Sequence, residues 1–311
     1  MPKGFYTQGF VILLREAITL DQVASALTGV PILKRVAATE CPWAIAGPSL
    51  VVGHRPEVNG LVSVDIVNHT WPDHMGDPKN EPEIFAAWAM GHFGPFAYPE
   101  GLTRAIQQSW SWGAASQVAS QHKAFLRIRS SYGFGAPSDA KVIPSDYRPL
   151  PELLFLSDLA SSLLGMAEAL CYFNPNGERL LPATRVQELI ARGKGAGPVP
   201  LELWSNIRMF NLGHSPAWTL MDTVGMGQLD APDHEACFQT DAYSCQEVDN
   251  FLFNAAFYVF EHGRVIEDGN TMDGPGGVRW QARTIENGMT APPREVIRWL
   301  PMDDHARPQG L

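Results

Sequence analysis

Residues 244–262 read SCQEVDNFLFNAAFYVFEH, and their apolar positions recur at the spacing of one helix face. Ser244 and Glu247 form the pattern of a capping box, and Gly263 follows the last helical position. The predicted inward stripe is Val248, Phe251, Leu252, Ala255 and Val259. Strand-like segments lie before this helix at 217–223 and 236–240, and after it at 280–285 and 295–300. A helix among strands, without steady alternation of the two, favours an α+β fold.

The residues before 132 give the same mixture of elements. Thr19 and Gln22 form a second capping box, which predicts a short helix through residue 27. Further helices are expected after Pro82 and after Pro99-Glu100, because proline is favoured in the first helical turn. Runs of apolar and β-branched residues predict strands at 10–14, 32–36, 49–52, 61–67 and 124–130.

The segment 132–150 is rich in Gly, Pro and Ser and predicts an internal boundary. After it we expect a long helix over 151–170, a turn at 174–177, a helix over 182–191 and a strand over 201–210. The expected organisation is an N-terminal half 1–131, the connector 132–150, a C-terminal half 151–302 and a tail 303–311. The predicted fold class is therefore α+β, with one or more mixed sheets, packed helices and two intimately associated halves.

Composition limits the classes of function. The chain has 311 residues, 45% of them hydrophobic and 18% charged, which is typical of a globular protein with a substantial core. Its formal charge is −10, and its six lysines form no basic run, so binding to nucleic acid is disfavoured. The apolar run at 10–14 is too short for a signal peptide, and none approaches the ~18 residues of a membrane span. We expect a soluble, cytoplasmic protein that does not bind membranes.

Residues 221–273 contain eleven acidic residues and one basic residue, Arg264, so this window alone carries the whole formal charge of −10. Solvated carboxylates often do no more than keep a protein soluble. An acidic face confined to one region can also steer and bind a basic partner. We expect the segment 230–241 to be its most available part. The candidate partner-binding residues are Asp230, Asp233, Glu235, Asp241, Glu247, Asp249, Asp268 and Asp273.

Metal and cofactor sites are not expected. Four possible ligands, His69, Asp73, His74 and Asp77, lie within nine residues, but their spacing matches no standard zinc arrangement and favours a polar turn. The segment that begins at Asp268 lacks the glycine and glutamate of a calcium loop. The Gly-rich segments match no phosphate-binding fingerprint, and no residue pattern identifies a catalytic group.

Four segments together resemble an uncharacterised bacterial family whose members occur beside type VI secretion toxins as their immunity proteins. These segments are FGPF at 93–96, ALCYFNPNG at 169–177, LMDTVGM at 220–226 and GRVIEDGNT at 263–271. The resemblance implies an α+β fold and a cognate effector toxin as partner, a nuclease with a basic cleft, and it carries over no contact residues. Two alternatives stay open, namely a hydrolase-like enzyme with an unrecognised site and an adaptor that loads the toxin for secretion.

Overall fold

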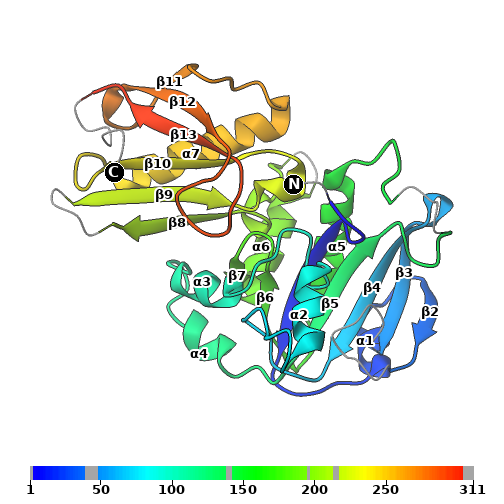
Figure 1. Ribbon diagram of the computed structural model, residues 1–311. Helices are drawn as coiled ribbons and strands as arrows, with labels where there is room; N and C mark the ends of the chain where they lie inside the picture. Colours follow the sequence, from blue (N-terminus) through cyan, green and yellow to red (C-terminus); the bar gives the residue numbers. More distant parts are fainter. Residues whose placement is uncertain (1–2, 39–47, 138–141, 195–196, 213–216, 304–311) are drawn as a thin grey trace. The chain divides into compact units, whose positions relative to one another are not determined.

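The computed structural model describes residues 3–38, 48–137, 142–194, 197–212 and 217–303. Contacts divide the chain into two compact units, Pro2–Trp204 and Ser205–Leu311, which are called the first and second unit below. Each unit contains one sheet with its own helices (Figure 1).

The described residues of the first unit form a seven-stranded antiparallel sheet in the order β2-β3-β4-β5-β1-β6-β7. Strand β1 is buried along its whole length and lies between β5 and β6, as expected for a strand whose residues 10–14 are all apolar. The strands are β1 (Gln8–Leu14), β2 (Ile32–Val36), β3 (Ser49–Arg55), β4 (Gly60–Val67), β5 (Ala124–Ser131), β6 (Ala169–Asn174) and β7 (Arg179–Leu181).

Helices pack on this sheet through an aromatic core. Trp71 lies at its centre, with edge-to-face contacts to Trp88, Phe93, Phe125 and Phe173 at 5.1 to 5.8 Å between ring centroids. The helices of the unit are α1 (Leu20–Ala26), α2 (Pro82–Ala89), α3 (Gly101–Gln107), α4 (Ala115–Ala119), α5 (Pro149–Leu163) and α6 (Ala183–Gly193), with single turns η1 (Pro56–Val58) and η2 (Leu201–Leu203).

The second unit contains a mixed sheet in the order β11-β12-β13-β10-β9-β8. Strands β10 and β13 run parallel, and the other neighbours are antiparallel. The strands are β8 (Asn206–Asn211), β9 (Trp218–Val224), β10 (Asp233–Gln239), β11 (Thr271–Asp273), β12 (Arg279–Ile285) and β13 (Val296–Pro301). Turns η3 (Met226–Leu229) and η4 (Pro275–Gly277) and helix α7 (Cys245–His262) complete the unit.

Helix α7 covers one face of the second sheet. The predicted inward stripe is confirmed, since all five of its residues are buried. Phe251 is its main anchor, with ring centroids 5.5 Å from Trp280 and 5.1 Å from Trp299. Two sheets with packed helices confirm the predicted α+β fold class.

Several local predictions were wrong. Helix α5 ends at Leu163, and the chain enters the first sheet as β6. The predicted helix ran on to residue 170 because the sequence between the two elements is largely apolar, and apolar spacing alone does not separate a buried helix from a buried strand. Strand β8 begins at Asn206, five residues later than expected, and α4 was not predicted. The Ser244 side chain makes no capping hydrogen bond, whereas Thr19 and Gln22 form their capping box as predicted.

The expected boundary at 132–150 differs from the division that the contacts give. Strands β6 and β7 follow this connector, yet β6 pairs with β1 and so belongs to the first sheet. The division therefore falls between Trp204 and Ser205. Residues 138–141 of the connector and 304–311 of the tail lie outside the described residues.

Two of the segments that carry the family resemblance meet in the first unit. Asn176 donates from Nδ2 to the carbonyl of Gly9 at 2.7 Å and accepts from the N–H of Phe96 at 3.0 Å. A Cβ on Gly94 would lie 2.6 Å from Asn176 Oδ1, and Gly94 has a φ of +136°, so only glycine fits there. These segments therefore join β1, the loop before α3 and the β6–β7 turn.

Candidate functional site

Three carboxylates of the acidic window are buried inside the second unit. Asp222 lies on β9, and Asp233 and Glu235 lie on β10, each with at most 4% of its surface exposed. Register places Asp222 opposite both Glu235 and Arg208, so these three side chains share one side of the sheet.

Asp222 has the most partners of the three. Arg208 donates to it from Nε at 2.9 Å and from Nη2 at 2.7 Å, and Arg294 donates from Nη2 at 2.6 Å. Thr290 Oγ1 lies 2.5 Å from the same carboxylate. Burial raises the pKa of Asp222, but Arg208 and Arg294 outweigh it and hold the pKa below its ordinary value. Asp222 is therefore ionised in the folded protein at neutral pH.

Asp233 and Glu235 extend this arrangement along β10. Asp233 Oδ1 accepts from Thr223 Oγ1 at 2.9 Å and from the N–H of Met226 at 3.1 Å, while Arg294 Nε lies 3.2 Å from Oδ2. Burial raises the pKa of Asp233. Glu235 pairs with Arg298 at 2.5 Å and accepts from the N–H of Met289 at 2.9 Å.

We call Arg208, Asp222, Asp233, Glu235, Arg294 and Arg298 the buried charge cluster. The positive charges of its three arginines balance the negative charges of its three carboxylates, so the cluster is neutral. The expectation that Asp233 and Glu235 belong to an exposed acidic face is therefore wrong. The arginines that neutralise them lie outside residues 221–273. The charge count of that window alone therefore overstated how much negative charge is available at the surface.

The other six candidate residues lie nearer the surface and do not form one cluster. Asp230 and Asp241 are exposed at left-handed turns, Glu247 and Asp249 lie in the first turns of α7, and Asp268 and Asp273 lie near β11. Asp249 is half-buried and the other five are exposed. Asp268 pairs with Arg283 at 2.9 Å and Asp273 with Arg279 at 3.5 Å.

A large acidic surplus nevertheless remains in the second unit. Residues 205–311 contain 7 arginines, no lysine and 15 carboxylate side chains, a formal charge of −8, whereas residues 2–204 carry −2. Because the buried charge cluster is neutral, the surplus belongs to the 12 carboxylates and 4 arginines outside it. The charge asymmetry therefore stands without Asp233 and Glu235, and the other six residues first expected remain among its carboxylates.

Helix α7 contributes a feature that was not predicted. Between Cys245 and His262 it carries Glu247, Asp249 and Glu261 and has no lysine or arginine. Phe253, Phe257 and Phe260 are half-buried and lie next to one another away from the inward stripe, at 6.5 and 6.0 Å between centroids. Their i, i+4, i+7 spacing is visible in the sequence as a second apolar row. We call these three rings and three carboxylates the outer face of α7.

The residues weighed as metal ligands have structural partners. The Asp73 carboxylate accepts from the N–H groups of Leu102 at 2.9 Å and Thr103 at 2.8 Å, at the start of α3. Asp77 accepts from Lys79 and Asn80 in a turn, and His74 lies 3.7 Å from Glu81. Within the described ranges, no three His, Cys, Asp or Glu side chains are grouped to hold a metal ion.

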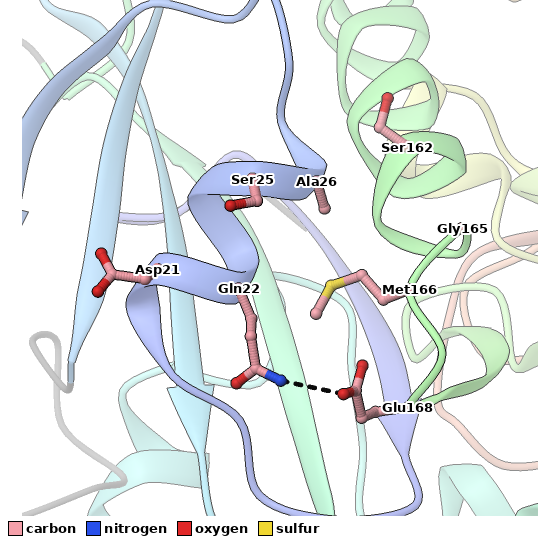
Figure 2. Close-up of a pocket in the computed structure, with 8 residues that line it drawn as sticks. All are labelled: Asp21, Gln22, Ser25, Ala26, Ser162, Gly165, Met166 and Glu168. Carbon is pink, nitrogen blue, oxygen red and sulfur yellow. Dashed lines mark hydrogen bonds between the residues drawn. The ribbon is translucent and has the colours of Figure 1, made fainter.

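A shallow pocket lies between α1 and the end of α5 in the first unit (Figure 2). Gln22 is held at both ends, since its Oε1 accepts from the N–H of Thr19 at 2.8 Å and its Nε2 donates to Glu168 at 3.0 Å. Met166 extends into the space between these elements. The other lining residues are Asp21, Ser25, Ala26, Ser162 and Gly165. The pocket is an open hollow at the surface with no converging titratable groups that would suggest catalysis.

His234, beside the buried charge cluster on β10, gives a prediction about acid stability. It is fully buried, and its Nδ1 accepts from Trp299 Nε1 at 3.1 Å. Burial lowers the pKa of His234 to about 3. Below the unfolded value of ~6.5 the unfolded chain takes up a proton that the native imidazole does not, which costs up to ~1.4 kcal/mol of stability per pH unit down to the folded pKa.

We expect His234→Gln to weaken the fall in stability between pH 6.5 and about 3, measured by urea unfolding at a series of pH values. The glutamine oxygen can still accept from Trp299, which limits the effect at neutral pH. His262→Gln is the control for the loss of a histidine at an exposed position. An unchanged profile for His234→Gln would contradict the buried neutral imidazole.

Comparison with protein families matches residues 222–300 to a domain of unknown function, DUF4261. The match lies within the second unit, begins at Asp222 and includes α7 and all of the buried charge cluster except Arg208. Comparisons with curated proteins and with solved structures gave no match. No helix among the described residues is long and apolar enough to cross a membrane.

Proposed function

We propose that this chain is an immunity protein that binds and neutralises a basic type VI secretion toxin of the nuclease class in the cytoplasm. The observation that carries the proposal is the acidic surplus of the second unit, which remains after the buried charge cluster is set aside. The resemblance to immunity proteins supports it and extends to TsiT, the proposed antidote to a secreted nuclease toxin.

Physical chemistry gives the mechanism. A nuclease binds a polyanion, so its active cleft is basic, and a dense carboxylate surface can cover that cleft and exclude nucleic acid. Attraction between the acidic surface and the basic cleft accelerates the association of the two proteins. This electrostatic contribution to binding weakens as the salt concentration rises. Apolar groups buried at the contact slow dissociation. The outer face of α7 supplies both carboxylates and aromatic rings.

The test is co-expression of the chain with the product of the adjacent toxin gene, scored by survival and by co-purification. The informative variant is Glu247→Gln, Asp249→Asn and Glu261→Gln combined. We expect its association rate with the toxin to fall about tenfold at low salt, with a weaker salt dependence, because steering charges act mainly on that rate. The association rate is measured by surface plasmon resonance at several ionic strengths.

The matched control removes three carboxylates from the first unit through Glu16→Gln, Glu83→Gln and Glu188→Gln, all exposed positions. It changes the formal charge of the chain by the same amount, so an equal loss would show that only total charge matters. The proposal fails if the unaltered chain neither protects cells nor co-purifies with the toxin. Loss of toxin delivery by the attacker, without self-poisoning, would favour the adaptor instead.

A further inference from the structure

We infer that the outer face of α7 is a docking surface for arginine side chains of a basic partner. This inference rests on the proposed function and specifies the chemistry of its contact. The helix buries one apolar stripe against the second sheet and carries a second row of rings, Phe253, Phe257 and Phe260, away from it. A surface helix normally carries polar residues there, so a second aromatic row marks a surface for a partner.

The three rings form a continuous row along the helix. Phe253 and Phe257 lie nearly parallel, with an interplanar angle of 12° and centroids 6.5 Å apart, and Phe257 and Phe260 are 6.0 Å apart. Tyr258, 44% exposed, stacks on His262 at 4.4 Å beside them. Neighbouring aromatic side chains of this kind are typical of the core of a protein–protein interface.

The charged residues of α7 indicate which kind of partner this face binds. Glu247 and Glu261 are exposed and Asp249 is half-buried on the same helix, which contains no lysine or arginine. The cations that complement these carboxylates must therefore come from outside α7. A partner with an acidic surface would be repelled by these carboxylates, and a neutral surface would gain no electrostatic attraction from them.

Arginine interacts well with both the rings and the carboxylates of this surface, whereas lysine interacts well only with the carboxylates. A guanidinium is planar, is weakly hydrated, stacks on aromatic faces and pairs with carboxylates through two parallel hydrogen bonds. An ammonium is a strongly hydrated point charge that gains less from a ring. Asp249, Phe253, Phe257 and Glu261 follow one another at intervals of four along α7, so the rings lie between carboxylates on one side of the helix. Such a row selects arginine-rich surfaces over equally charged lysine-rich ones.

The test compares two synthetic peptides of equal charge, nona-arginine and nona-lysine, as probes of the full chain. Calorimetric titration at fixed ionic strength should show nona-arginine binding about fivefold more tightly, since one exposed cation–π contact contributes about 0.5–1 kcal/mol. This comparison needs no variant. Equal affinities for the two peptides would overturn the inference.

Variants then locate the preference. Phe253→Leu, Phe257→Leu and Phe260→Leu combined keep the apolar volume but remove the rings, so the fivefold preference should disappear while nona-lysine affinity is retained. Phe155→Leu is the control, because Phe155 is a half-buried helical phenylalanine in the first unit. Helicity and Tm of each variant are checked by circular dichroism. An arginine preference that persists without the rings also overturns the inference.

The two proposals fail separately. Absence of protection in co-expression, with the arginine preference intact, refutes the immunity function and leaves the surface chemistry standing. Protection that is unchanged in the leucine variant, without any arginine preference, refutes the surface and leaves the immunity function standing.

Discussion

Replacing Asp222 with alanine is expected to lower the free energy of unfolding by about 3–5 kcal/mol, the usual cost of removing one partner from a buried ion pair. Asp222 is fully buried and accepts from Arg208, Arg294 and Thr290. Without it Arg208, itself fully buried, loses its bidentate carboxylate. The remaining carboxylates of the cluster pair with Arg294 and Arg298, so they do not replace that contact.

Urea unfolding at pH 7 measures this effect. Asp268→Asn, which breaks the surface pair with Arg283, is the control and should leave the midpoint nearly unchanged because solvent screens that pair. Toxin binding by folded Asp222→Ala protein should be retained, because the side chain is buried. A loss below ~1 kcal/mol would mean that the buried charge cluster is not a structural unit.

Replacing Asp65 with alanine, in the first unit, is expected to lower the free energy of unfolding by a similar amount, about 3–5 kcal/mol. Asp65 lies on β4 opposite Arg127 of β5, and its Oδ2 is 3.3 Å from Arg127 Nε and is also bound by Arg129. Both arginines are only 1% exposed. Burial, followed by the neighbouring Arg129, lowers the pKa of Arg127 to about 10, so loss of the carboxylate leaves two like charges in a poorly solvated site.

The double variant Asp65→Ala with Arg127→Met separates charge from packing. If the loss arises from an uncompensated buried charge, removal of one arginine should restore part of the stability. Methionine is chosen because its side chain fills the space of the aliphatic part of the arginine. Thermal unfolding of both variants against wild type gives the comparison. Equal destabilisation by the single and double variants would show that packing, not charge, carries the effect.

Periodicity predicted much of the fold. The inward stripe of α7 and nearly the whole of β5 follow from apolar spacing and apolar runs, because α7 buries one face and β5 is buried along its whole length. The path of β6 could not be predicted. Its residues continue the apolar run of α5, and only pairing with β1 across more than 150 residues makes them a strand.

The candidate surface was harder to predict, for a physical reason. Whether a carboxylate is exposed depends on which arginine the fold brings to it. Glu235 meets Arg298 from a strand 63 positions later, and Asp222 meets Arg208 from an earlier strand. A charge count over adjacent residues cannot contain such pairs. The ring row of α7 was accessible in principle, because its spacing is helical and lies off the inward stripe.

Strand β8 has a consequence for how the second unit is isolated. The DUF4261 match starts at Asp222, but the edge strand that pairs with β9 and supplies Arg208 precedes it. A chain cut at the start of the match would also lose residues 218–221, more than half of β9, and would expose the backbone of β10 as a new edge, a template for aggregation. It would also remove Arg208 from the buried charge cluster and so leave Asp222 without that partner. The smallest piece suited to expression therefore begins at Ser205, where the contacts divide the chain.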